Sequence, residues 1–179
     1  MGTDKEIKSS IYNNLDVESE FFVRKCTLED LEGVIEVNEK ELPEDYPFFF
    51  YKSILDNYAD SFLVACKKNN PKKIIGYIMW RIESAPSLNG LKLINKGHLV
   101  SIAVSETNRR KGVSTALLSN SMPEVLNDDL SEYVLEVRVS NYPAVNLYKK
   151  FDYTIHSIKK NYYRDGENAY FMIKKVKDI

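Results

Sequence analysis

The sequence predicts a mixed α/β domain in which a mixed, mostly antiparallel sheet is flanked by helices. A chain of 179 residues with 44% hydrophobic residues is long enough for one core of ordinary size and short for two. Segments with a two-residue apolar period alternate with segments of helical period. No internal repeat, low-complexity tract or linker interrupts them. We therefore expect a polar extension over residues 1–20 and a single domain over residues 21–179.

The first half of the chain is expected to hold a strand, two helices and a hairpin. The strand covers Phe21–Cys26, and Thr27 with Asp30 resembles a capping box at the start of a helix that runs to about Lys40. The prolines of "ELPEDYP" end this helix, because each disfavours helix in the residue before it. A second helix follows over residues 48–58. The runs "SFLVACKK" and "KIIGYIMWRIES" on either side of "NNPK" predict a hairpin.

The second half is expected to alternate strands with helices and to close on a hairpin. A loop, "APSLNGLKLINK", precedes the strand "GHLVSIAV" and a helix that begins with "GVSTALLSNSM". The strand "YVLEVRV" leads to the helix "PAVNLYKKF", which has Pro143 in its first turn. The hairpin consists of "YTIHSIKKNYYR", the tight "DGEN" and "AYFMIKKV". The predicted order is thus β α α β β β α β α β β.

Charge and composition exclude several classes of protein. The net charge is −1 and the pI about 6.2, so no overall field attracts nucleic acid or an anionic membrane. The apolar runs are too short for a membrane helix, and the first ten residues are too charged for a signal peptide. We expect a soluble, cytoplasmic protein. Cys26 and Cys66 match no disulfide or zinc pattern, and we interpret both as buried fillers.

One local cluster of charge stands out against this background. The stretch "NRRKGVSTALL" places three positive charges before a helix start, where the helix dipole favours anions. Gly112 would let the backbone approach a phosphate, and arginine supplies charge and paired donors. The GxxxxGK[ST] and GxGxxG patterns are absent, which argues against nucleoside triphosphates and dinucleotides. Two alternatives stay open: the pyrophosphate of another cofactor, or a solvated basic turn.

Neighbouring segments add a family resemblance. The pattern [RQ]xxGx[AGS], here Arg109, Gly112 and Ser114, lies after a strand and before "SNYPAVNLYKKFDY", and it resembles the acetyl-CoA site of the GCN5-related N-acetyltransferase (GNAT) superfamily. The blocks "LPEDYP", "GHLVSIAV", "RRKGVSTALL", "LEVRVSNYPAVNLYKK" and "YYRDGENAYFM" look like NatA-type, archaeal-like catalytic subunits of N-terminal acetyltransferases. This resemblance covers about residues 21–176. Ser114 replaces the commoner Ala or Gly, and "KKFDY", with Asp152, stands where relatives usually have a Gly-Phe pair.

The resemblance implies a GNAT-like sheet that splays between two parallel strands, and acetyl-CoA as the cosubstrate. The diphosphate would lie on the N–H groups and basic side chains of the turn, while the backbone of the preceding strand would pair with the pantetheine arm and the thioester. The implied cofactor contacts are Ile102, Ala103, Val104, Arg109, Arg110, Lys111, Gly112, Val113, Ser114, Thr115, Asn141, Asn146 and Tyr148. Asn141 could instead cap the following helix, and Asn146 could be an exposed helix residue.

Acetyl transfer to an amine requires an unprotonated nitrogen and a proton for the departing thiolate. His98 and Glu136 lie on two predicted strands and could meet through one water if those strands are neighbours. The resemblance implies that this pair relays the proton, that Glu44 positions or deprotonates the amine, and that Tyr148 lies near the thioester sulfur.

Each of these four residues also has a purely structural interpretation. His98 could be a packed core residue, and Glu136 could pair with Arg138. Glu44 could be a solvated turn residue, and Tyr148 could be a core aromatic. His98 and Glu136 could together bind a metal, but two ligands are too few for a structural zinc site, so we expect none.

The aromatic loops "YPFFFY" and "NYYRDGENAY" would contact the acceptor, since aromatics with polar tips suit peptide surfaces. The resemblance implies that Tyr46, Tyr162 and Tyr163 hydrogen-bond the first peptide units. We therefore expect acetylation of the α-amino group of protein N-termini, with an auxiliary subunit or the ribosome as further partners and no membrane or nucleic acid. The alternatives are an acetyltransferase acting on lysine side chains or polyamines, and a non-catalytic acyl-CoA-binding module.

Overall fold

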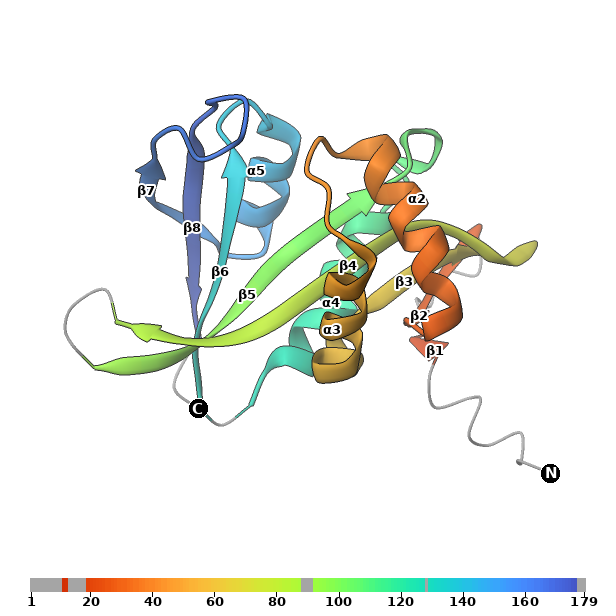
Figure 1. Ribbon diagram of the computed structural model, residues 1–179, viewed down its shortest axis with the longest axis horizontal. Helices are drawn as coiled ribbons and strands as arrows, with labels where there is room; N and C mark the ends of the chain where they lie inside the picture. Colours follow the sequence, from red (N-terminus) through yellow and green to blue (C-terminus); the bar gives the residue numbers. More distant parts are fainter. Residues whose placement is uncertain (1–10, 13–18, 88–91, 128, 177–179) are drawn as a thin grey trace. The chain divides into compact units, whose positions relative to one another are not determined.

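The computed structural model describes residues 11–12, 19–87, 92–127 and 129–176, which form two compact units (Figure 1). Unit 1 holds the described residues up to Arg81 together with Val100–Val125, and unit 2 holds those of Ile82–Leu99 and from Leu126 onward. Two long strands, β4 (Asn70–Pro86) and β5 (Leu93–Val104), contribute residues to both units.

In unit 1 the hydrogen-bonded strand order is β1-β2-β3-β4-β5. β1 (Ile11–Tyr12), β2 (Phe21–Lys25) and β3 (Leu63–Lys67) are successive antiparallel neighbours, and β3 forms the predicted hairpin with β4. The short strand β1 falls in the region read from the sequence as an extension. The helices α2 (Leu31–Glu41) and α3 (Phe48–Tyr58) lie on one face of these strands, and α4 (Val113–Val125) lies on the other (Figure 1). Three single 3₁₀ turns complete the unit: η1 (Leu28–Asp30), η2 (Ala59–Ser61) and η3 (Glu106–Asn108).

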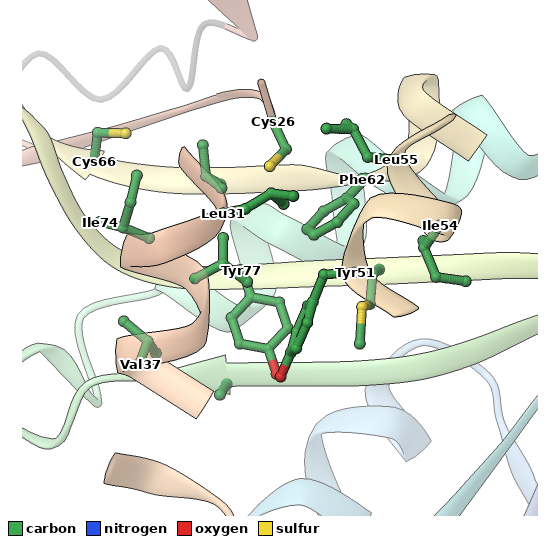
Figure 2. Close-up of a cluster of buried hydrophobic side chains, with 14 residues drawn as sticks. Cys26, Leu31, Val37, Tyr51, Ile54, Leu55, Phe62, Cys66, Ile74 and Tyr77 are labelled. Carbon is green, nitrogen blue, oxygen red and sulfur yellow. The ribbon is translucent and has the colours of Figure 1, made fainter. Parts of the chain in front are cut away.

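The core of unit 1 lies between α2, α3 and the sheet (Figure 2). Alternation along β4 directs Tyr77 and Met79 toward these helices, whereas Trp80 is buried on the opposite side and donates from Nε1 to Ser121 Oγ of α4 at 2.9 Å. Cys26 and Cys66 are buried free thiols, as predicted, and burial raises the pKa of both, that of Cys66 to about 11.

The capping box predicted at the start of α2 is present and has an additional partner. The Thr27 backbone N–H and hydroxyl both donate to Asp30 Oδ2, at 2.8 and 2.9 Å. The Arg24 guanidinium donates to both carboxylate oxygens of Asp30, at 2.6 and 2.8 Å. Burial alone would raise the pKa of Asp30, but the hydrogen bonds from Arg24 and Thr27 hold it below its usual value.

In unit 2 the strand order is β4-β5-β6-β8-β7. β6 (Leu130–Arg138) runs parallel to β5, with Asn95–His98 of β5 paired to Leu130–Val134, and this is the predicted parallel pair. β8 (Ala169–Lys175) lies antiparallel between β6 and β7 (Thr154–Lys159), and α5 (Tyr142–Lys150) connects β6 to β7 (Figure 1).

The prediction of a loop over residues 85–96 was wrong at both ends. β4 continues to Pro86 and β5 already begins at Leu93, with the Ser87 N–H donating to the Lys92 carbonyl at 2.8 Å. Residues 88–91 lie outside the described part. Ala85, Pro86 and Leu93 to Asn95 are exposed or partly exposed, and their apolar and polar residues do not alternate in the way by which strands are read from sequence.

Asp152, which stands where relatives usually have a Gly-Phe pair, lies in the turn that ends α5. The Tyr153 N–H donates to the Tyr148 carbonyl and the Asp152 N–H to the Lys149 carbonyl, both at 3.1 Å, which are the two bonds of a Schellman motif. Asp152 has a φ of 66°, in the left-handed region that favours glycine.

We predict that Asp152→Gly stabilises the protein by about 0.5–1 kcal/mol, because glycine adopts this conformation without a Cβ penalty. The exposed 3.5 Å contact of Asp152 with Lys174 contributes little. Asp152→Ala, which keeps the penalty and loses the local polar side chain, should destabilise. Urea unfolding of the three proteins gives the order, and a Gly variant no more stable than the Ala variant would contradict the prediction.

Candidate active site

The predicted site residues are divided between the two units. Unit 1 contains Glu44, Tyr46, residues 102–104 and the turn 109–115. Unit 2 contains the remaining residues, which are His98, Glu136, Asn141, Asn146, Tyr148, Tyr162 and Tyr163.

The basic turn before α4 has the backbone form of an anion site. Arg110 (φ 64°) and Gly112 (φ 83°) both lie in the left-handed region. A Cβ on Gly112 would meet no atom within 4 Å, so conformation rather than space calls for glycine there. The Ala116 N–H donates to the Gly112 carbonyl at 2.9 Å, so α4 starts here and the N–H groups of Val113, Ser114 and Thr115 lack intrahelical acceptors. A diphosphate fits this donor set.

The three basic side chains of the turn differ in their contacts. Arg110 and Lys111 are exposed, and Lys111 Nζ lies 3.4 Å from Glu20 Oε2. Arg109 donates from Nε to the Val104 carbonyl at 3.2 Å and from Nη2 to Glu41 Oε2. The turn therefore presents exposed positive charge, but two nitrogens of the Arg109 guanidinium already hydrogen-bond to other parts of the protein.

The strand before the turn is largely buried where the pantetheine contacts were predicted. Ala103 and Val104 are buried, whereas Ile102 is partly exposed. The Ser105 N–H donates to the Ile75 carbonyl of β4 at 2.9 Å, which fixes the point where the chain leaves the strand.

The loop that carries Glu44 is fastened to β5 by a chain of buried hydrogen bonds. Asn38 Nδ2 donates to the Glu44 carbonyl at 2.7 Å, and the Tyr77 hydroxyl donates to Asn38 Oδ1 at 2.6 Å. The Tyr77 hydroxyl also lies 2.7 Å from Ser101 Oγ of β5. Burial raises the pKa of Tyr77, so the hydroxyl stays protonated. Sequence reasoning missed this chain, although a tyrosine inside an apolar strand was a usable signal, because its buried hydroxyl needs a partner.

Tyr46 is held by neighbouring aromatic rings. Its ring stacks on Phe50 with centroids 4.8 Å apart and an interplanar angle of 18°, and it meets Tyr51 edge-on at 5.9 Å. The half-buried side chains of Glu44 and Tyr46 thus project from a loop anchored both by hydrogen bonds and by ring packing.

We predict that Tyr77→Phe lowers the free energy of unfolding by about 1–3 kcal/mol, because it leaves the buried Asn38 and Ser101 each short of a partner. Tyr142→Phe is the matched control, since it removes a hydroxyl from a side chain that is 69% exposed. Denaturant unfolding measures both losses. Equal losses in the two variants would show that the Tyr77 hydroxyl does not hold the loop.

In unit 2, His98 and Glu136 are in direct contact. His98 Nε2 lies 2.7 Å from Glu136 Oε2, and His98 Nδ1 lies 3.2 Å from Glu83 Oε2 of β4. The expectation that His98 and Glu136 meet through a water is therefore corrected. His98 pairs with Val134 on the neighbouring strand, and Glu136 lies two residues after Val134 on the same face of β6, within direct reach of His98. The two side chains contact each other directly, so Glu136 can orient the His98 ring without an intervening water.

Lys159 of β7 holds the second oxygen of Glu136. Its Nζ donates to Glu136 Oε1 and lies 4.4 Å from the centroid of the Phe171 ring. Burial would raise the pKa of Glu136, but His98 and then Lys159 lower it to about 2. Glu136 is thus ionised at every physiological pH. Its suggested partner, Arg138, instead donates to Asp165 and Glu167, at 2.8 and 2.7 Å.

We predict that Lys159→Met lowers the free energy of unfolding at pH 7 by about 1 kcal/mol, a modest value because the lysine side chain is 40% exposed and screened by solvent. The depressed pKa of Glu136 means that the stabilisation is complete above the unfolded-state pKa of about 4.3 and is lost as the pH falls toward about 2. The difference from wild type should therefore shrink over this acid range.

Lys160→Met is the matched control for Lys159→Met, since it removes the same charge from the exposed neighbouring residue. Denaturant unfolding at a series of pH values compares the three proteins. A wild-type advantage that persists unchanged at pH 2 would contradict the assignment of this energy to ionised Glu136.

The predicted substrate tyrosines of unit 2 lie at the turn between β7 and β8. The rings of Tyr162 and Tyr163 meet edge-on at 5.1 Å, and the Arg138 guanidinium lies 4.0 Å from the centroid of Tyr163. The Gly166 N–H donates to the Tyr163 carbonyl, so Tyr163 belongs to the turn itself. Tyr162 is 46% exposed and presents a ring to solvent.

On α5 the predicted cofactor residues have three different environments. Asn141 Oδ1 accepts the Ala144 N–H at 3.2 Å, so the alternative interpretation of Asn141 as a helix cap is confirmed. Asn146 is exposed. Tyr148 is buried beside Tyr153, with ring centroids 5.9 Å apart, and burial raises the pKa of Tyr148.

Two negative findings concern the described residues only. Within them, His, Cys, Asp and Glu side chains nowhere gather in a group of three or more that could hold a metal ion. The helices of this part of the chain also lack the length and hydropathy needed to span a membrane.

The sequence and the fold have counterparts in one family. The family described as "Acetyltransferase (GNAT) family" matches residues 28–153, and the chain belongs to this family. Among its relatives, the N-alpha-acetyltransferase of Saccharolobus solfataricus is 44% identical over 158 residues, covering 87% of this chain and 93% of the relative. The N-terminal acetyltransferase A complex catalytic subunit NAA10 of Arabidopsis thaliana is 32% identical, covering 87% and 78% of the two chains. The crystal structure of Ard1 from Thermoplasma volcanium superposes with a TM-score of 0.75 at 26% identity, covering 89% of this chain and 99% of that one.

Proposed function

We infer that this protein is an enzyme that transfers the acetyl group of acetyl-CoA to the α-amino group of protein N-termini. The observation that supports this inference is the turn before α4, where left-handed residues, exposed cations and open helix N–H groups make a donor set suited to a diphosphate. Family membership and the N-alpha-acetyltransferase relatives support the reaction type. We also propose that the enzyme works in the cytoplasm, with an auxiliary subunit or the ribosome as further partners.

The turn would bind the diphosphate of acetyl-CoA through the N–H groups of residues 110–115 and the basic side chains at 109–111. The strand residues 102–104 would orient the pantetheine arm, together with Asn146 and Tyr148. Acetyl-CoA supplies the acyl group as a thioester, whose carbonyl carbon gains the C–N bond as its C–S bond breaks. Asn141, whose Oδ1 caps α5, would contact the cofactor through its side-chain Nδ2.

We assign the proton chemistry to His98, with Glu136 as the fixed carboxylate that orients it. A carboxylate with a pKa of about 2 has little affinity for a proton near neutral pH, so Glu136 is a poor base on its own. It can hold the His98 ring at Nε2 and stabilise the charge when the ring gains a proton. Glu44 and Tyr46, on the anchored loop, would position the incoming amine, and Tyr162 and Tyr163 the following peptide units.

Tyr148 would act on the leaving thiolate as a hydrogen-bond donor. Burial keeps its phenol protonated and makes full release of the proton costly. Donation of a hydrogen bond to the sulfur needs no such release. This role makes Tyr148 an orienting and stabilising group more than an acid.

A peptide panel tests the proposed acceptor. The purified chain is incubated with acetyl-CoA and peptides that begin with Ser, Ala, Met-Leu or Met-Glu, and with one N-terminally blocked peptide that carries an internal lysine. Mass spectrometry should locate the added acetyl group on the free α-amino groups. Acetylation confined to the blocked peptide would make the protein a lysine acetyltransferase, and cofactor binding without any transfer would make it a non-catalytic module.

We predict that Glu136→Gln lowers kcat by roughly 10²-fold, the usual contribution of a positioned acid–base group, and leaves the Kd for acetyl-CoA within about twofold of wild type. Glutamine keeps the shape but loses the charge that holds His98. Glu132→Gln is a control on the same face of the same strand, where Glu132 Oε2 lies 3.4 Å from the buried Lys96 Nζ without a hydrogen bond. Steady-state kinetics and calorimetry separate turnover from binding. An unchanged kcat would remove Glu136 from the mechanism.

A further inference from the structure

Glu41, the last residue of α2, contacts the cofactor turn at two points. Its Oε1 accepts the backbone N–H of Glu106 at 2.9 Å, and its Oε2 accepts Nη2 of Arg109. Glu106 is the first residue of η3, so the Glu41 carboxylate acts as a remote cap on that 3₁₀ turn. A single carboxylate thus fixes both the beginning of η3 and the side chain that follows its end.

The position of Glu41 is unfavourable without these partners. The C-terminus of a helix carries the negative end of the dipole, which repels a carboxylate. The Glu41 side chain is also only 11% exposed, so water can compensate it little. Donors from the Glu106–Arg109 segment therefore have to be in place whenever Glu41 is ionised and α2 is intact. The need of Glu41 for these donors therefore links the end of α2 to the cofactor turn.

Arg109 is fixed by the same contact. Its Nε donates to the Val104 carbonyl, where β5 ends, while Nη2 is held by Glu41. The side chain bridges the end of the strand and the end of the helix, and the residue after it adopts the left-handed φ of 64°. Pairing with Arg109 also neutralises Glu41, whose negative charge would otherwise oppose an anion bound at the turn.

Glu41 stands three residues before Glu44. The turn of helix that carries Glu41 also carries Asn38, which holds the Glu44 carbonyl and belongs to the buried chain through Tyr77. The last turn of α2 therefore holds both the cofactor turn, through Glu41, and the loop assigned to the amine, through Asn38. All of these contacts lie within unit 1.

We propose that Glu41 is a positioning residue for acetyl-CoA, which holds the turn Glu106–Gly112 in its diphosphate-binding form and through which Arg109 acts. Of the three basic side chains assigned above to the diphosphate, Arg110 and Lys111 then meet it directly, and Arg109 contributes by fixing the turn. This inference rests on the proposed function, because it assigns the support of the same cofactor site.

The first test compares Glu41→Ala with Glu39→Ala, an exposed glutamate on the same helix. Glu41→Ala should raise the KM for acetyl-CoA about tenfold, as expected for the loss of a charge-assisted hydrogen bond, and leave kcat at saturating acetyl-CoA within about twofold. Glu39→Ala should change neither. A loss confined to kcat, or equal effects in both variants, would overturn the proposal.

Glu41→Gln tests whether removing the charge of Glu41 raises or lowers the KM for acetyl-CoA. Glutamine can still accept the Glu106 N–H but no longer pairs with Arg109, so the KM should rise by about threefold. If Glu41 acted on the cofactor only by its charge, removal of that charge would instead lower the KM. A lower KM in Glu41→Gln would therefore overturn the positioning role.

Glu106→Pro removes the same contact from the other side and serves if Glu41→Ala fails to fold. Proline is compatible with the first position of a helical turn, and the preceding Ser105 (φ −54°, ψ 137°) already has the extended form that proline requires of its neighbour. The variant loses the N–H that Glu41 accepts and also the exposed Glu106 carboxylate. Glu106→Ala, which loses the carboxylate alone, is therefore its control. The KM of Glu106→Pro for acetyl-CoA should exceed that of Glu106→Ala by about threefold, and equal KM values would contradict the cap.

A double-mutant cycle tests whether Arg109 acts through Glu41. Arg109→Met and Glu41→Ala should each raise the KM, and the double variant should be hardly worse than either one. Arg110→Met should also raise the KM, but additively with Glu41→Ala. Full additivity of Arg109→Met with Glu41→Ala would assign Arg109 to the diphosphate directly and overturn this part of the proposal.

Calorimetric titration of the wild-type protein with CoA distinguishes a failure of the proposed function from a failure of the role assigned to Glu41. Absence of CoA binding by the wild type would remove the proposed function and this proposal with it. Wild-type binding and transfer with normal CoA affinity in Glu41→Ala would leave the proposed function intact and overturn only the role of Glu41.

Discussion

The constraint on which both units depend is that a carboxylate removed from water must be met by donors. Asp30 receives Arg24 and Thr27 at the start of α2, and Glu41 receives Arg109 and the Glu106 N–H at its end. In unit 2, Glu136 receives His98 and Lys159. The contacts of Asp30 are local, whereas those of Glu41 and Glu136 join segments far apart in the sequence. The distant contacts satisfy buried charge and also fix where functional groups lie.

The cofactor turn relies on backbone conformation more than on side-chain identity. Its donors are N–H groups, and they are exposed because Arg110 and Gly112 turn the chain into the left-handed region before α4 begins. Residues 109–112 of this turn are all exposed, so burial does little to hold them. The Val104 carbonyl and the Glu41 carboxylate therefore hold the turn through Arg109, although its side chain is as exposed as that of Lys111.

Sequence reasoning could predict what local pattern encodes. Apolar period and turn chemistry predict the bounds of α3 and the β3–β4 hairpin, whereas the parallel pair β5 and β6 was implied by the family resemblance. Alternation placed His98 and Glu136 each on a strand, and the two could meet only because those strands are neighbours. Sequence reasoning could not predict Glu83 or Lys159 as partners of this pair, because their approach depends on strand register. Arg138 was paired with Glu136 on proximity in sequence, whereas the β7–β8 turn supplied closer acids.

The electrostatics of the His98–Glu136 pair also bear on the acceptor. Lys159 and His98 together keep Glu136 ionised down to a pH of about 2, so this carboxylate cannot strip a proton from a strongly basic ammonium group. A lysine side chain, with a pKa of about 10.4, is almost wholly charged near neutrality, whereas an α-amino group, with a pKa of about 8, is already neutral in a sizeable minority of molecules. A relay of this kind suffices for an amine that arrives neutral and has only to lose its proton after attack. A chain end arrives neutral more often than a lysine, so it suits better a pair in which Glu136 orients His98 and does not itself act as the base.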